Sequence, residues 1–182
     1  MPPWWLLGIG FTHVQILSQY AGSGLFHGMA GLPVSTDVAW FVGMGANILV
    51  LLACGAVFRG PRLDRLKRLL APSIILNIVG FLLSVWPTGV TANDDPVALL
   101  GAIALGMGQA IMFLLWADVF NRAKIEEAEI ALPLSSLVVL AYAVVVPLLP
   151  ASLNGIPMLV APLASGATLY LSFQRLPVAQ AC

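Results

Sequence analysis

The chain has 182 residues, of which 60% are hydrophobic and 9% are charged, and its formal net charge is zero. Soluble domains usually carry about 25% charged residues, so this composition excludes a water-exposed globular surface. The neutral balance also excludes the basic footprint of a nucleic-acid-binding protein, and Cys54 and Cys182 are too few for a disulfide framework or a metal-ligand set.

Long apolar runs predict an all-α, polytopic membrane protein with six transmembrane helices in one domain over residues 1–182. Trp4 and Trp5 at the start of the first span are typical of an aromatic anchor at the membrane interface. Asp95 followed by Pro96 predicts the cap and the first residue of the fourth span. The expected spans are 4–22, 38–58, 69–86, 97–118, 131–149 and 158–173.

Polar residues form a stripe in the first span. Thr12, Gln15 and Gln19 follow the i, i+3, i+7 spacing of one helical face, and His13 flanks that face. Because such groups are costly against lipid, the stripe is expected to face other helices or a water-filled cavity. Two interpretations stay open: hydrogen bonds that hold the bundle together, and contacts with a small-molecule ligand.

The stretch "RGPRLDRLKRLL", residues 59–70, lies between the second and third spans and holds five of the eight Lys and Arg residues. In the fourth span, Gln109 shares a helical face with Trp116 and joins the cavity candidates. The polar segment "NRAKIEEAE", residues 121–129, predicts a short surface helix before the fifth span.

The basic residues predict the orientation in the membrane. With six spans, all eight lie on the side of the two termini and the second and fourth loops, and the opposite side carries none. The positive-inside rule therefore places both termini in the cytoplasm, as in a bacterial inner-membrane protein. The eight residues are Arg59, Arg62, Arg65, Lys67, Arg68, Arg122, Lys124 and Arg175.

Catalytic motifs are missing from the sequence. Neither His13 nor His27 has a serine, cysteine or carboxylate partner at an informative spacing, and there is no HExxH, GxSxG or Walker A sequence. We therefore expect no enzyme activity, no catalytic residue, no metal site and no cofactor.

The basic stretch contains Gly60, Asp64, Arg65 and Arg68 in the order G-x-x-x-D-R-x-K-R. This order resembles the loop between the second and third helices of major facilitator superfamily proteins, although Lys67 stands where that family has a second glycine. The resemblance implies contacts between helix ends on the cytoplasmic face that set a conformational equilibrium. The alternative is a positively charged topological anchor with no gating role.

Six helices with both termini inside are the size of one half of the facilitator fold, in which the first and fourth helices line the cavity. The resemblance therefore implies a second six-helix half or a homodimer. The residues "LWAD", 115–118, which end a glycine-rich span before a short charged loop, are also similar to the membrane portion of bacterial LuxR-type regulators. Those regulators join twelve such helices to a helix-turn-helix domain, so this chain corresponds to the N-terminal half without DNA-binding activity.

Three functions follow as expectations. The first is a small-molecule-sensing membrane domain of the LuxR-type regulators, because uncharged polar residues suit binding better than ion-coupled transport. The second is a half-size transporter that dimerises to move a small neutral solute. The third is a structural or assembly subunit. The lipid bilayer is the expected partner in each case.

Overall fold

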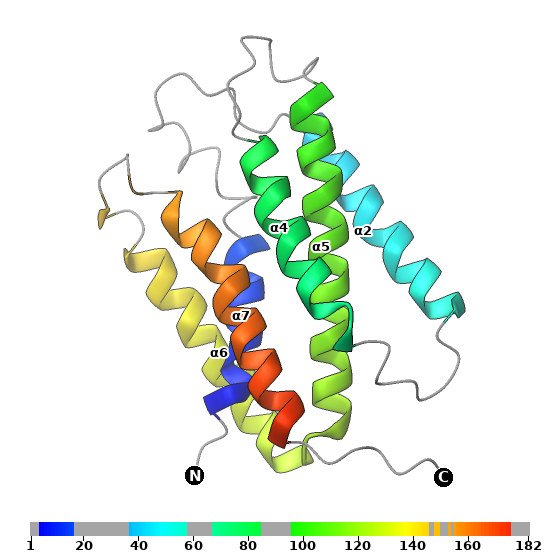
Figure 1. Ribbon diagram of the computed structural model, residues 1–182. Helices are drawn as coiled ribbons and strands as arrows, with labels where there is room; N and C mark the ends of the chain where they lie inside the picture. Colours follow the sequence, from blue (N-terminus) through cyan, green and yellow to red (C-terminus); the bar gives the residue numbers. More distant parts are fainter. Residues whose placement is uncertain are drawn as a thin grey trace.

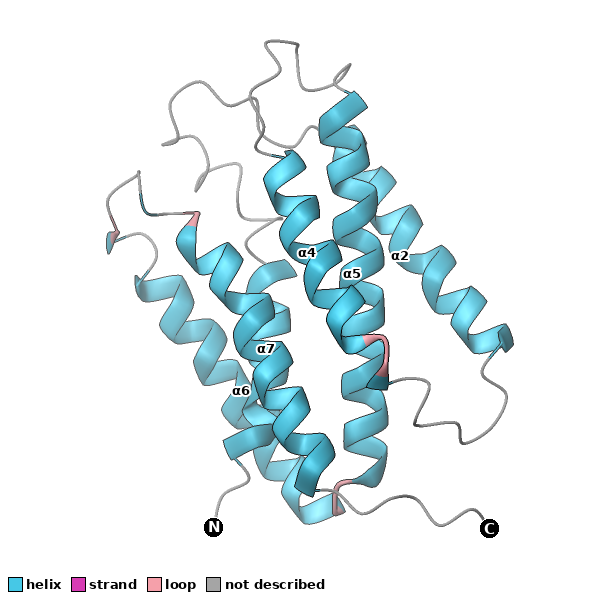
Figure 2. Cartoon of the chain, in the orientation of Figure 1, coloured by secondary structure: helices cyan, strands magenta, loops and turns pink. Residues whose placement is uncertain are grey.

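The protein is described by a computed structural model that covers residues 4–16, 37–57, 67–84, 96–145, 148–149, 153 and 155–175. All regular secondary structure within these residues is helical, as Figure 2 shows. The prediction of an all-α protein is therefore confirmed for the described part of the chain.

Six helical elements follow one another along the described part of the chain. A 3₁₀-helix, η1 (Trp4–Gly8), continues as an α-helix over residues 9–16, and we call residues 4–16 together the first helix. The others are α2 (Asp37–Val57), α4 (Leu70–Ser84), α5 (Pro96–Arg122), α6 (Ile125–Val145) and α7 (Ile156–Arg175).

Four of these helices, α2, α5, α6 and α7, are long and apolar enough to cross a membrane, and α4 is a shorter apolar helix. An α-helix needs about 20 apolar residues to span the hydrocarbon core. The helices are thus compatible with an integral membrane protein, as the composition predicts.

The boundaries of α5 and α6 differ in part from the expected ones. Helix α5 begins at Pro96, whose fixed φ angle and missing N–H suit the first helical position. It continues to Arg122, and α6 already begins at Ile125, so residues 121–129 are shared between two long helices rather than forming a separate one. Glu126 and Glu127 lie in the first turn of α6, where negative charge favours the helix dipole.

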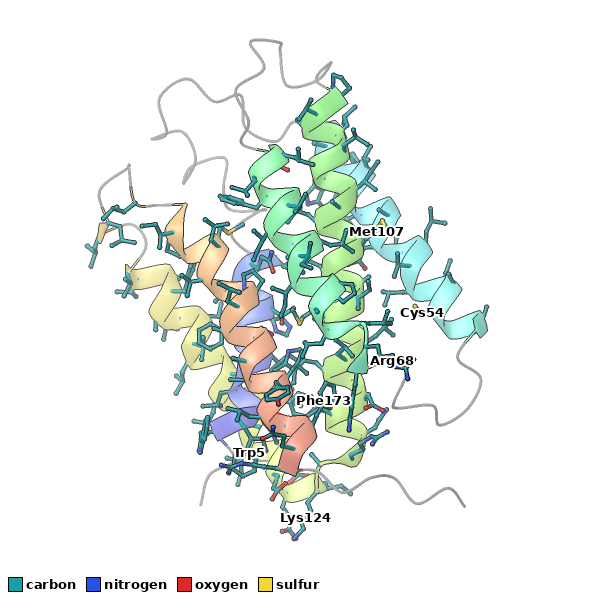
Figure 3. All side chains as sticks on the ribbon, viewed as in Figure 1. Trp5, Cys54, Arg68, Met107, Lys124 and Phe173 are labelled. Carbon is teal, nitrogen blue, oxygen red and sulfur yellow. The ribbon has the colours of Figure 1, made fainter. Side chains whose placement is uncertain are left out.

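Successive helices from α4 to α7 run in opposite directions, as the colours of Figure 1 show. The ends of α5 and α7 and the beginnings of the first helix, α4 and α6 therefore lie at one end of the bundle. The described basic residues gather at this end, and Figure 3 labels Arg68 and Lys124 in the lower part of the view. The full set is Lys67, Arg68, Arg122, Lys124 and Arg175.

Helix α5 packs against both α4 and α2, and the close approach depends on glycines. A Cβ atom on Gly106 would overlap the backbone of Gly43 in α2, and one on Gly80 of α4 would lie 2.6 Å from the backbone nitrogen of Leu105. Small residues let helices approach where lipid supplies no hydrophobic driving force between them. These contacts fix α2 and α4 on two sides of α5.

The first helix lies behind α7 in Figure 1, between α6 and the α4–α5 pair, and it contacts both α6 and α7. Leu6 of this helix, Trp116 of α5 and Leu169 of α7 belong to one apolar cluster and are each 0% exposed. Most of the described first helix is therefore enclosed by other helices, and the polar side chains on its enclosed faces must find partners in the bundle.

Candidate functional site: a buried polar network around the first helix

The hydroxyl group of Ser165 on α7 connects Thr12 of the first helix and Trp116 of α5. The Thr12 Oγ1 atom lies 2.8 Å from Ser165 Oγ, and the indole Nε1 of Trp116 donates a 2.9 Å hydrogen bond to the same Ser165 oxygen. All three side chains are at most 1% exposed. Three helices thus share one hydrogen-bonded centre that contains only uncharged groups.

Gln15 joins the first helix to α4. Its Nε2 atom donates a 2.9 Å hydrogen bond to Asn77 Oδ1, and Asn77 Nδ2 donates a 2.8 Å bond to the backbone oxygen of Ser73. Ser73 Oγ in turn donates a 2.7 Å bond to the carbonyl of Leu70. Gln15 and Asn77 are 1% and 0% exposed, so an unpaired amide here would carry a full desolvation cost.

A stripe on α7 matches the first helix residue by residue. Ser165, Thr168 and Ser172 share one face of α7 at i, i+3, i+7. Ser165 meets Thr12, Thr168 lies against Gly8, where a Cβ atom would overlap its hydroxyl, and Ser172 Oγ lies 3.4 Å from the Trp5 carbonyl. This antiparallel register holds the first helix against α7 over its described length.

Gln109 lies on the buried side of α5 and is 4% exposed. Its neighbour Gly108 leaves room for Asn77, because a Cβ atom on Gly108 would lie 2.7 Å from Asn77 Nδ2. The side chains of Gln109 and Trp116 are both enclosed, and the role of Gln109 as a cavity residue stays a prediction.

His13 has different surroundings from Thr12 and Gln15. Its side chain is exposed, its Nδ1 atom lies 3.0 Å from the carbonyl oxygen of Ile9, and its ring meets the Phe113 ring edge-to-face with the centroids 5.6 Å apart. The structure therefore does not bring His13 into the network of Thr12 and Gln15.

The remaining candidate residues fall at the edge of the described chain or outside it. Gln19 lies outside the described residues, as do Gly60, Asp64 and Arg65 of the facilitator-like loop. Arg68 is described and exposed in the turn before α4. The proposed gating contacts of that loop stay a prediction.

Aromatic rings contact two of the cations at the end of the bundle where the basic residues gather, which we call the basic end. The Arg175 guanidinium lies 4.6 Å from the ring centroid of Trp5 and 5.4 Å from that of Trp4, and Lys67 Nζ lies 5.6 Å from the Phe173 centroid. These cation–π contacts connect the beginning of the first helix to the end of α7. Figure 3 shows Trp5 and Phe173 toward this end of the bundle.

The carboxylate of Asp118 lies near the same end, in the last part of α5. Asp118 Oδ1 pairs with Arg122 Nη2 at 3.1 Å, one helical turn further along α5. The second carboxylate oxygen, Oδ2, is buried without a hydrogen-bond partner. The pair orders the last turn of α5, where a cation also favours the helix dipole.

The chemistry that the network offers is hydrogen bonding by hydroxyl, amide and indole groups. Across the described ranges, no three His, Cys, Asp or Glu side chains gather where they would hold a metal ion. The first helix supplies one hydroxyl and one amide to the interior, and both point at other helices. A small molecule that forms such bonds would have to exchange with those partners.

Sequence reasoning missed the partners of the stripe. Ser165 was not among the predicted site residues, although the Ser165, Thr168 and Ser172 spacing on α7 is a signal of the same kind as the stripe on the first helix. Comparison with known protein families, curated proteins and solved structures finds no match to this chain.

Proposed function

We propose that the protein is a non-enzymatic, multi-pass membrane domain that senses a small uncharged molecule, comparable to the membrane half of a LuxR-type regulator. The observation that carries this proposal is the uncharged network in which Thr12 and Gln15 connect the first helix to α7, α5 and α4. A molecule with hydroxyl or amide groups competes for these bonds because it offers the same donors and acceptors.

A response to binding is supported by the position of α7. Its polar stripe faces the first helix, and its last residue, Arg175, stacks on Trp4 and Trp5. A ligand that takes over the partner of Thr12 loosens the first helix from α7, and the change reaches the basic end through a continuous helix. Differential binding to the two arrangements supplies the free energy for such a shift.

The test is ligand retention. We expect native mass spectrometry of the protein, extracted from cells in bilayer discs, to show an uncharged small molecule enriched about fivefold or more over the Gln15→Leu variant, as the loss of one buried hydrogen bond predicts. Leu49→Ala, at a 68% exposed position of α2, is the matched control. Equal retention by all three proteins would refute the binding proposal.

A half-size transporter is the second candidate. Large apolar side chains on α2 and α6 are exposed, among them Leu52 and Leu140 at 65% and 59%, and leave area on which a second copy can pack. Uptake of labelled glycerol, a small neutral solute, into liposomes that contain the protein would favour this reading. Uptake no faster than in protein-free liposomes would leave sensing as the better proposal.

The proposed location is the bacterial inner membrane with both termini in the cytoplasm. The gathering of Arg122, Lys124 and Arg175 at one end of the bundle supports this orientation. In a background without native cysteines, Lys124→Cys should react with an impermeant maleimide only after the cells are opened. Leu153→Cys, before α7, should react in intact cells, and the reverse pattern would contradict the orientation.

A further inference from the structure

His13 is an exposed imidazole beside the Phe113 ring of α5. Its ring contacts Phe113 of α5, and Phe113 lies about 14 Å before Arg122 at the 1.5 Å rise per residue of an α-helix. Because the hydrocarbon core is about 30 Å thick, His13 stands close to the middle of the membrane in the proposed orientation. An ionisable side chain at that depth is costly against lipid and needs a polar partner.

The hydrogen bond of His13 defines what its ring can do. The Ile9 carbonyl oxygen is an acceptor only, so the Nδ1 atom 3.0 Å away carries the proton and donates. In the neutral ring, Nε2 is then an acceptor with a free lone pair. No other polar group of the described chain bonds this nitrogen, and the side chain is exposed. The ring is thus oriented in advance to accept one hydrogen bond.

Helices α5 and α6 border the face of the first helix that carries His13. Gly10, one helical turn before His13, lies close to α6, since a Cβ atom on it would be 2.6 Å from the Ser135 carbonyl oxygen and 2.9 Å from Val138 Cβ. The face of the first helix that carries His13 is therefore bordered by α6 on one side and by Phe113 of α5 on the other. A molecule that reaches this face from the membrane meets the Phe113 ring beside the His13 acceptor.

We propose that His13 Nε2 binds the hydroxyl group of a membrane-dissolved, uncharged alcohol whose apolar body lies against Phe113. The inference rests on the proposed sensing function and adds to it a contact outside the Thr12 and Gln15 network, with a ligand class: a hydrogen-bond donor with an apolar body, which enters from the lipid. An ether or hydrocarbon of the same size has no donor and gains nothing from the imidazole.

The experiment uses a photoreactive decanol, which carries a diazirine on its chain, and the methyl ether of the same compound. In proteoliposomes, we expect the alcohol to label the peptides that contain His13 or Phe113 about fivefold more than the ether does, as one hydrogen bond predicts. His13→Phe should lower labelling by the alcohol to the level of the ether, whereas His13→Gln, which retains an acceptor, should keep most of it. Leu49→Phe, on the exposed side of α2, is the control and should not change it.

Equal labelling by the alcohol and the ether overturns the inference, and this comparison uses the unaltered protein, so it does not depend on the folding of a variant. Efficient disulfide-linked dimers of His13→Cys, made without Cys54 and Cys182, also overturn it, because a second copy would then cover the imidazole. If a small molecule is retained in a Gln15-dependent way but the decanol does not label, only the alcohol class is wrong. If neither is observed, the sensing proposal fails as well.

Discussion

Helices α2 and α5 are both long and apolar, yet they have opposite surroundings. Of the most apolar 18-residue stretch of each helix, 44% of the residues are buried inside the bundle in α5, against 6% in α2. The buried helix carries Gly106, Gly108, Gln109 and Trp116 on its inner side, whereas Leu49 and Leu52 of α2 are exposed. In a bilayer, small and polar residues mark the interior, because apolar side chains are equally well accommodated by lipid.

The largest expected effect is at the crossing of the two helices. Gly106→Val places side-chain atoms onto the backbone of Gly43, so we expect α2 to be displaced and the free energy of unfolding in bicelles to fall by about 3 kcal/mol. Gly45→Val is the matched control and should be nearly neutral, because a Cβ atom on Gly45, two residues after Gly43, would have no neighbour within 4 Å. Similar losses for both variants would contradict the crossing.

A smaller loss is expected where α5 meets the first helix. Trp116→Phe removes the indole donor to Ser165 but keeps an aromatic ring, so the free energy of unfolding should fall by about 1 to 2 kcal/mol. The same substitution combined with Ser165→Ala should cost less than the sum of the two single changes. Strict additivity in reversible unfolding would show that the two groups do not interact.

The next largest effect on stability is expected at the end of the bundle where the basic residues gather. Arg175→Gln removes the cation that stacks on Trp4 and Trp5, and we expect a loss of about 1 kcal/mol together with a change in tryptophan fluorescence. Arg68→Gln is the charge-matched control, since Arg68 is exposed in the turn before α4. The two variants should differ in fluorescence, and identical spectra would speak against the stacking.

The smallest effect is expected on the outer side of α2. Leu49→Ala should change the free energy of unfolding by about 0.5 kcal/mol or less, because its side chain is 68% exposed and loses few protein contacts. Circular dichroism during unfolding in bicelles measures this. A loss as large as that of Trp116→Phe would mean that α2 is covered by another chain.

The sequence was a good guide to the helices because apolar length is a local property. The start of α5 at Pro96 and the burial of Thr12 and Gln15 were both predictable from local pattern. The start of α6 at Ile125, six residues before the expected one, was not predictable in this way. Charged residues such as Glu126 are tolerated in a helix once they lie outside its apolar part.

The partners within the candidate site were beyond local pattern. Gln15 bonds Asn77, and Thr12 and Trp116 share Ser165. Both arrangements depend on which helices are neighbours and in which register they pack. The exposure of His13, one residue from the buried Thr12, likewise depends on where α5 and α6 lie beside the first helix. Helical periodicity defines a stripe but does not identify what faces it.

The most direct test of the polar interior is a double-mutant cycle between Gln15→Leu and Asn77→Leu, measured by reversible unfolding in bicelles. We expect a coupling energy of about 0.6 to 1.7 kcal/mol, the range of interhelical hydrogen bonds in membranes, because each single change leaves the other buried amide without its partner. A coupling energy of zero would contradict the account, since the first helix would then not be held in the bundle by its polar side chains.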